Sequence, residues 1–311
     1  MATAFPSEFA FIEWVKRGQA ATPAVTVGIG DDCAVLPASP VATLVTTDML
    51  MEGSCFRLAE AGPYRVGRKA MAVNISDIAA MAGTPKTAFV SLGLPRTMSF
   101  EDVKELHRGL QSMAADFGVV IAGGDTNTWD GPLTISVTLL GEVHPRGPVL
   151  RSGAKVGDWI FVTGPLGGSI FGHHLDFMPR VAAARWLHES VDLHAMIDVS
   201  DGLAKDLHRI AVASGVGAEL HAAAIPVADA ARQLSLQDGR SPLIHALGDG
   251  EDFELVFTVA AEDGPRLLRI QPPDGATLHA SGRMVEGGFW LVDRDTRTAL
   301  EPLGYEHRFT S

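Results

Sequence analysis

The sequence predicts an α/β (α+β) protein built in two halves. Runs of β-branched apolar residues alternate with segments of helical periodicity, and this alternation occurs in both halves of the chain. Between residues 144 and 157 the composition shifts to Pro, Gly and Arg, which is typical of a domain boundary. The chain has 311 residues, and a domain usually takes roughly 150. We therefore expect two domains, residues 1–146 and residues 147–311.

In the first half, apolar residues at helical spacing predict helices over 5–17, 63–82 and 99–117. The third of these begins at Ser99, which is followed by acidic residues in a pattern that resembles a capping box. Apolar, β-branched runs predict strands over 41–47, 87–94, 119–122 and 134–143. We expect the first strand to end at Asp48, and the third to run into a loop at 123–127.

The second half repeats this pattern. We expect strands over 159–163, 195–199 and 253–259, with a helix over 203–213. The glycine-rich segment Gly164-Pro-Leu-Gly-Gly-Ser169 has two interpretations of equal weight: main-chain N–H groups that hold an anion before a helix, or a tight turn.

Composition excludes several functions. The net charge of −12 disfavours binding to nucleic acid or to a membrane surface. The two cysteines, Cys33 and Cys55, are too few for a disulfide scaffold or a cysteine-rich zinc site. No secretory signal and no membrane-spanning apolar stretch is visible, so we expect a soluble, cytoplasmic protein. An acidic protein that handles phosphates would need metal ions to offset the repulsion.

The main chemical signal is a recurring layout in which an apolar element is followed by small residues and then by aspartate. Converging carboxylates repel each other unless cations lie between them, and Mg²⁺ prefers oxygen ligands together with substrate phosphates. The set therefore predicts a site for several Mg²⁺ ions and a nucleotide phosphate chain. Taken singly, each segment is more often a turn or a helix cap. The segments are Gly28-Ile-Gly-Asp-Asp32, Thr46-Thr-Asp48, Asn74-Ile-Ser-Asp77, Gly123-Gly-Asp-Thr126 and Asp198-Val-Ser-Asp-Gly202.

Two other phosphate-binding motifs are incomplete in this sequence. The segment Gly62–Lys69 has the glycine spacing of a P-loop, but Arg68 stands where the lysine belongs and no Ser or Thr follows Lys69. Gly28-Ile-Gly30 lacks the third glycine of a dinucleotide fingerprint, because Cys33 occupies that position.

Seven segments together resemble thiamine-monophosphate kinase, in that family's order and over almost the whole chain. The resemblance implies the fold of the aminoimidazole ribonucleotide synthetase superfamily, with an N-terminal half that pairs in a barrel-like homodimer and ATP bound between the halves. It implies direct transfer of phosphate from ATP to thiamine monophosphate, with Mg²⁺ and without a general base. The segments are 28–36, 46–48, 69–81, 121–126, 151–158, 197–203 and 249–255.

The resemblance also implies roles for individual residues. Asp48 and Asp125 would act in catalysis through metal. The metal ligands would be Asp31, Thr46, Thr47, Asp48, Asp77, Asp125, Asp198 and Asp201. The residues that contact ATP would be His107, Gly124, Asp125, Arg151 and Ser200, and those near the thiamine substrate would be Cys55, Glu251 and Tyr305.

Two features depart from the family pattern. Cys55 stands where relatives usually have a substrate-contacting histidine, and residues 172–189 form a shorter segment than in many relatives. Three alternatives compete with the kinase interpretation: another superfamily enzyme, such as a selenophosphate synthetase or aminoimidazole ribonucleotide synthetase, a non-catalytic acidic protein that binds metal or nucleotide, and a degenerate member without turnover.

Overall fold

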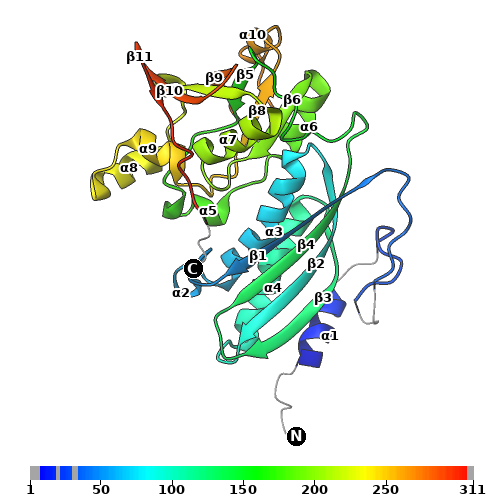
Figure 1. The fold of residues 1–311 in the computed structure, drawn as a ribbon. Coiled ribbons are helices and arrows are strands. Elements are labelled where there is room, and N and C mark those ends of the chain that lie inside the picture. Colours follow the sequence, from blue (N-terminus) through cyan, green and yellow to red (C-terminus); the bar gives the residue numbers. More distant parts are fainter. Residues whose placement is uncertain (1–7, 19–21, 30–33, 307–311) are drawn as a thin grey trace, which may run out of the picture. The chain divides into compact units, whose positions relative to one another are not determined.

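The computed structural model describes residues 8–18, 22–29 and 34–306. Helices and strands alternate along these residues, which confirms the expected α/β class (Figure 1). The chain forms two compact units. Unit 1 includes Thr84–Val143 and the described residues up to Ile78, and unit 2 includes Ala79–Gly83 and the described residues from His144 onward.

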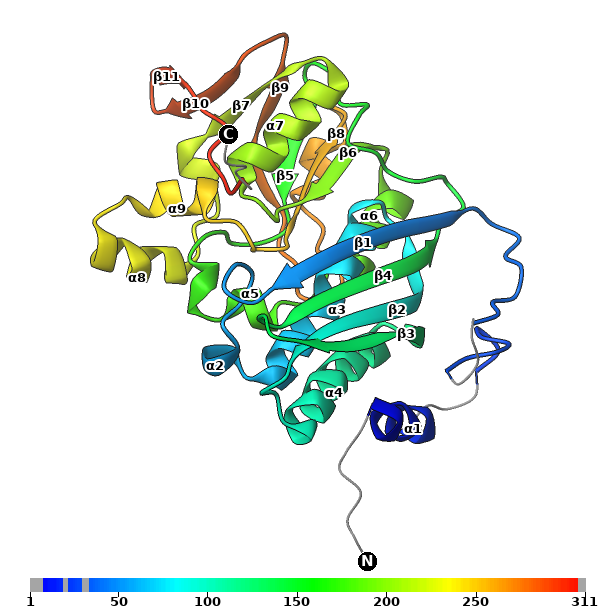
Figure 2. The same cartoon turned by 60° about the horizontal axis from the view of Figure 1, so that its bottom comes forward.

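Unit 1 contains a four-stranded mixed sheet within its described residues. The strand order is β1-β4-β2-β3, in which β2 and β3 are parallel and the other neighbours antiparallel. Figure 2 shows α3 and α4 together on one face of this sheet. The elements are α1 (Glu8–Gly18), β1 (Thr43–Met51), α2 (Leu58–Ala61), α3 (Pro63–Ala80), β2 (Thr84–Pro95), α4 (Phe100–Asp116), β3 (Val120–Trp129) and β4 (Thr134–Glu142).

Two glycines let α3 and α4 touch backbone to backbone. A Cβ atom on Gly67 would lie 2.0 Å from the carbonyl oxygen of Leu106, and one on Gly109 would lie 1.9 Å from the carbonyl oxygen of Tyr64. Gly67, whose spacing imitates a P-loop, therefore serves helix packing. The expected cap of α4 is confirmed, since Ser99 Oγ accepts a hydrogen bond from the main-chain N–H of Asp102 at 3.1 Å.

The face of this sheet that α3 and α4 do not cover, called the open face below, carries exposed side chains among the described residues. Side chains alternate between the faces along β1, so Leu44 and Leu50 are buried while Val45 and Met49 are 66% and 61% exposed. Met51 lies on the open face as well and is also exposed.

Unit 2 contains a seven-stranded sheet within its described residues, in the order β11-β10-β7-β9-β5-β8-β6. Its core packs apolar side chains of β5, β6 and β8 against α7, which buries Ile160, Ile197, Val256 and Leu207 completely or nearly so. The strands are β5 (Trp159–Val162), β6 (Leu193–Asp198), β7 (Gly217–His221), β8 (Leu255–Val259), β9 (His279–Val285), β10 (Phe289–Asp293) and β11 (Thr296–Ala299). The helices are α5 (His173–Asp176), α6 (Val181–Ser190), α7 (Leu203–Ser214), α8 (Asp229–Asp238), α9 (Pro242–Gly248) and α10 (Gly264–Leu267), with 3₁₀ turns η1 (Ser169–Phe171) and η2 (Ala222–Ala224).

Two expected boundaries are wrong where they matter most. Strand β1 continues past Asp48 to Met51, and β3 runs straight through the expected loop at 123–127. Gly-Gly-Asp-Thr-Asn favours a turn locally, but pairing with β2 from Gly123 to Trp129 overrides that preference. Asp48 and Asp125 thus lie inside strands, whereas Asp198 is the last residue of β6, as expected for a strand end. No helix in the described part of the chain is both long and apolar enough to cross a membrane.

Candidate active site

Two acidic side chains meet on the helix-covered side of unit 1. Asp48 of β1 is hydrogen-bonded to the carboxyl group of Asp77 on α3, and the hydroxyl of Thr46 donates to Asp77 Oδ2. Burial, then the charge of Asp77 and the hydrogen bond between them, raises the pKa of Asp48 to about 7. Two half-buried carboxyl groups this close repel each other when both are ionised, so they share a proton or bind a cation. Carboxylate and hydroxyl oxygens are ligands that suit Mg²⁺.

Thr47 lies on the opposite face of the sheet from this pair. Its hydroxyl contacts Thr138 Oγ1 at 3.1 Å, on the open face. Only the main-chain carbonyl of Thr47 is therefore suited to a ligand role beside Asp48. Asp31 lies outside the described residues.

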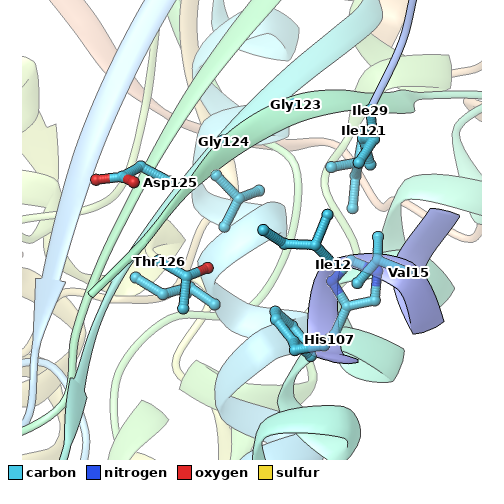
Figure 3. A pocket seen from close by; sticks show the side chains of 12 residues that line it. Ile12, Val15, Ile29, His107, Ile121, Gly123, Gly124, Asp125 and Thr126 are labelled. Carbon is cyan, nitrogen blue, oxygen red and sulfur yellow. The ribbon is translucent and has the colours of Figure 1, made fainter. Parts of the chain in front are cut away.

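Asp125 lies far from the acidic pair within the same chain. The register aligns Asp48 with Val137, Val90 and Gly124 across the four strands. Three strand spacings separate Asp48 from Gly124, a distance of about 14 Å along the sheet. One metal ion cannot bridge the two carboxylates inside a single chain. Asp125 is exposed, and Figure 3 shows its carboxylate directed away from His107.

Asp125 belongs to the open face by register. It pairs with Ser91, which is aligned with Ser136 and, beyond it, with Met49. Because paired residues share a face, Asp125 and the exposed Met49 lie on the same side of the sheet. Asp48 lies on the other side.

A mostly apolar pocket of about 110 Å³ lies between α1, α4, β2 and β3 (Figure 3). His107 lines it and is only 4% exposed, and among the described residues its Nε2 has no hydrogen-bond partner. Burial lowers the pKa of His107 to about 4, so the imidazole is neutral at physiological pH. A neutral imidazole presents one N–H donor and one acceptor nitrogen.

The walls of this pocket are aromatic on one side and main chain on the other. Phe11 lines the pocket and meets the His107 ring edge to face with centroids 5.7 Å apart, and Trp14, which is not a lining residue, contacts the same ring at 5.6 Å. A Cβ atom on Gly124 would lie 1.8 Å from the carbonyl oxygen of Val90, so only glycine fits there. A second pocket of about 370 Å³ adjoins the first and shares Val15, Ile29, His107 and Ile121 with it.

In unit 2, three segments far apart in the sequence converge. Val199 and Ser200, which follow β6, accept hydrogen bonds from the main-chain N–H groups of Phe253 and Glu251 at 2.9 and 2.7 Å. The main-chain N–H of Tyr305 donates to the carbonyl oxygen of Asp201 at 3.0 Å. The structure therefore brings Ser200, Asp201, Glu251 and Tyr305 together within unit 2.

Two residues that support this cluster were missed by the sequence reasoning. Asp206 is fully buried and accepts hydrogen bonds from the main-chain N–H groups of Asp201 and Gly202 at 2.9 and 3.1 Å. Arg209 forms ion pairs with both Asp201 and Asp206. Asp206 lies in the first turn of α7, where an acidic side chain reaching back to free N–H groups is a recognisable signal.

The remaining predicted residues are less constrained. Asp198 is 4% exposed at the end of β6, and Arg151 lies exposed in a loop. Cys55 is half-buried just beyond β1, where its carbonyl oxygen accepts a hydrogen bond from Lys69 Nζ at 2.6 Å. Among the described residues, no three His, Cys, Asp or Glu side chains gather closely enough to hold a metal ion by themselves.

The structure decides between the two interpretations of segment 164–169. The main-chain N–H groups of Gly167 and Gly168 donate to Asp252 Oδ1 and Asp249 Oδ2, both at 2.9 Å. The segment is a turn, and the anions at its N–H groups are carboxylates of the chain itself.

Comparison with known proteins agrees with this architecture. The chain matches the AIR synthase related protein, N-terminal domain, over residues 30–143 and the corresponding C-terminal domain over residues 169–288. It is 46% identical to a thiamine-monophosphate kinase of Rhodopirellula baltica, over 96% of this chain and 97% of that protein.

Solved structures lead to the same family. A thiamine-monophosphate kinase from Stenotrophomonas maltophilia K279a has a TM-score of 0.80 and 32% identity, and the match covers 92% of this chain and 96% of that one. AaThiL complexed with AMPPCP and TMP has a TM-score of 0.75 and 29% identity, over 99% of each chain.

A two-unit α/β protein with these two domains is an AIR synthase related protein. Within that class, the chain belongs to the thiamine-monophosphate kinase family. The resemblance inferred from the sequence motifs is thereby confirmed.

Proposed function

We propose that this chain is an ATP-dependent kinase that converts thiamine monophosphate to thiamine diphosphate. The observation that carries the proposal is the match to a thiamine-monophosphate kinase at 46% identity over 96% of the chain. The acidic pair Asp48 and Asp77 gives this match a chemical basis. A solved relative that is complexed with AMPPCP and TMP supports both substrates.

In this proposal the pocket beside His107 receives the adenine base. The aromatic and aliphatic walls suit a flat ring, and the neutral imidazole offers the edge of the base the hydrogen bond that His107 Nε2 lacks. Gly124 would let the strand approach the nucleotide closely. Arg151 and Ser200 remain the predicted ATP contacts contributed by unit 2.

The reaction is a transfer between two phosphate groups. A phosphate oxygen of thiamine monophosphate forms a bond to the γ-phosphorus of ATP, while the bond from that phosphorus to the β–γ bridging oxygen breaks and ADP leaves. The attacking oxygen is already anionic at neutral pH, so no side chain must remove a proton.

The acidic residues fit a role as ligands for magnesium. A bound Mg²⁺ supplies charge neutralisation on the transferring phosphate. Asp48 and Asp77, with the hydroxyl of Thr46 beside them, would hold it in unit 1. Thr47 would contribute its main-chain carbonyl. The other predicted ligands are Asp31, Asp125, Asp198 and Asp201, of which Asp201 would have to exchange its contact with Arg209 for metal.

The acceptor would be bound by Glu251, Tyr305 and Cys55. The first two lie on segments joined through the main chain of residues 200 and 201. The side chain of Tyr305 is 49% exposed and thus accessible to a ligand.

A homodimer is part of the same proposal. The open face of the four-stranded sheet carries exposed Val45, Met49 and Met51, and β1 and β3 are its edge strands. A second copy packed on this face would bury these side chains, as two sheets packed face to face do. Asp125 lies on the same face as Met49, so it is positioned to face the partner. We also propose a cytoplasmic location, where ATP is supplied.

A direct assay tests the activity. The purified protein is incubated with ATP and Mg²⁺ and, separately, with thiamine, thiamine monophosphate and an aminoimidazole ribonucleotide precursor, and both ADP and the phosphorylated product are measured. We expect ADP and thiamine diphosphate in equal amounts with thiamine monophosphate alone. Asp48→Asn, purified in parallel, controls for a contaminating kinase. Turnover with a different acceptor, or none with any, would refute the proposal.

A further inference from the structure

The glycine-rich turn and the loop that precedes β8 are joined by a pair of carboxylates. Asp252 accepts from the N–H of Gly167 and Asp249 accepts from the N–H of Gly168, each at 2.9 Å. Consecutive N–H groups are thus bound by two acidic side chains of one short loop. Asp249 is itself held by His245, whose Nδ1 lies 2.9 Å from Oδ1.

Two further hydrogen bonds fasten the same segments. Ser169 Oγ donates to the carbonyl oxygen of Gly250 at 2.7 Å. The Nε2 atom of His173 lies 2.9 Å from the carbonyl oxygen of Asp252. Side chains of Ser169 in the turn and of His173 in α5 therefore bind the main chain of the loop, while side chains of the loop bind the main chain of the turn.

The turn requires glycine at both positions. Gly167 and Gly168 have φ angles of 91° and 73°, which side chains rarely adopt. A Cβ atom would lie 2.6 Å from the main-chain nitrogen of Ala246 in the first case and 2.4 Å from the carbonyl carbon of Ala230 in the second. The turn is thus a rigid support packed against α8 and α9.

The loop held by this support is strained. Glu251 and Phe253 have φ angles of 54° and 50°, in the left-handed region that costs non-glycine residues free energy. The ring of Phe253 stacks on Phe177 with centroids 4.0 Å apart, and the N–H of Glu251 reaches Ser200. Strain of this kind persists only where surrounding contacts over-determine the backbone.

We propose that Asp249 and Asp252 are positioning residues that clamp the loop to the diglycine turn and so hold Glu251 in the backbone conformation that binds the phosphate acceptor. The inference rests on the proposed function in one respect, the contact of Glu251 with the thiamine substrate. The carboxylate clamp comprises Asp249 and Asp252 with the N–H groups of Gly167 and Gly168.

Asp252 is the more informative residue to change. It is 2% exposed, and within the described part of the chain its Oδ2 has no hydrogen-bond partner. Burial raises its pKa well above the usual range. Its role is therefore that of an oxygen acceptor for Gly167, which asparagine can also supply and alanine cannot.

The experiment compares Asp252→Ala, Asp252→Asn and a matched control, Asp158→Ala. Asp158 is also buried in unit 2 and accepts a main-chain N–H, that of Lys155, at 2.7 Å. Hydrogen–deuterium exchange is followed at the amides of Glu251 and Phe253, and KM is measured for both substrates. Asp252→Ala should speed exchange at these amides and raise KM for thiamine monophosphate about tenfold, the effect of one lost buried hydrogen bond. KM for ATP should stay within about twofold.

Each outcome bears on a separate claim. Rescue of exchange and KM by Asp252→Asn, with no effect on either in Asp158→Ala, would support the clamp. Unchanged exchange in Asp252→Ala would overturn it. Faster exchange with unchanged KM for thiamine monophosphate would overturn its role in binding the acceptor. A wild-type protein inactive on thiamine monophosphate would refute the proposed function, while exchange would still decide whether the clamp exists.

Discussion

The acidic residues of the two units are stabilised in different ways. In unit 1, burial and the neighbouring Asp77 both raise the pKa of Asp48. In unit 2, Asp201 and Asp206 share the guanidinium group of Arg209, and the N–H groups of the loop donate to Asp206. Burial raises the pKa of Asp206 to about 6, while Arg209 and these N–H groups lower it.

This difference separates two uses of buried carboxylates. Asp201 and Asp206 of unit 2 organise main chain and have a compensating charge, Arg209, built into the fold. The pair in unit 1 gains its compensation from a proton or from a cation that enters with the substrate. Dependence on metal should therefore be concentrated at Asp48 and Asp77.

The largest expected effect is on turnover when Asp48 loses its charge. Asp48→Asn keeps the size of the side chain but removes a charged ligand of the metal ion that would neutralise developing charge, so kcat should fall by about 100-fold or more. Steady-state kinetics at saturating ATP and Mg²⁺ measures this. Asp130→Asn is the matched control, because Asp130 is exposed in the same unit and pairs only at the surface with Arg96. Normal turnover of Asp48→Asn would refute the assignment of Asp48 as a metal ligand required for catalysis.

The second prediction concerns which chain supplies Asp125. If Asp125 completes the site of a partner chain, each homodimer of Asp48→Asn or Asp125→Asn is inactive, but a mixed dimer keeps one intact site. Mixing the two variants under subunit exchange should restore about a quarter of wild-type turnover, because half of the dimers are mixed and one of their two sites is intact. Mixtures as inactive as their components would show that both residues act within one chain or at separate ions.

How much of this site the sequence could predict depends on the range of the interactions involved. Asp77 stands out by its position within an apolar helix, and the Ser99 cap follows from residues three apart. The open-face position of Asp125 could not be predicted, because it depends on how β3 aligns with β2 and not on local preference. Strands β7, β9 and β11 were missed because polar and small residues interrupt their apolar ones, and β10 was missed although four of its five residues are apolar. The carboxylates that accept from the N–H groups of Gly167 and Gly168 belong to Asp252 and Asp249, more than 80 residues away in the sequence. A local sequence pattern could not predict these hydrogen bonds.

A smaller effect is expected on stability as a function of pH. The ordinary pKa of 3.8 for Asp48 becomes about 7 in the folded protein. Between these values the folded state holds a proton that the unfolded state has lost, so stability falls as pH rises from about 4 to about 7. Thermal unfolding in EDTA should show this decline in the wild type and a flatter profile in Asp48→Asn.

Magnesium provides the counterpart of this experiment. Near pH 8, added Mg²⁺ should raise the unfolding temperature of the wild type by a few degrees and that of Asp48→Asn by much less, because a ligand stabilises the state that binds it. An equal rise in the unfolding temperature of the wild type and of Asp48→Asn would show that Asp48 is not a ligand of the Mg²⁺ ion.

The smallest expected effect is at Cys55. The hydrogen bonds recorded for Cys55 use its main chain: its N–H donates to the carbonyl oxygen of Met51 at 2.9 Å, and its carbonyl oxygen accepts from Lys69 Nζ at 2.6 Å. Substitution of the side chain leaves both bonds in place. If the side chain borders the acceptor, Cys55→His should change KM for thiamine monophosphate a few-fold and leave KM for ATP nearly constant. Cys55→Ala is the control for packing, since a free cysteine often acts as a small hydrophobe that fills space. Equal changes in both Michaelis constants, or the same result with alanine as with histidine, would assign Cys55 to packing alone.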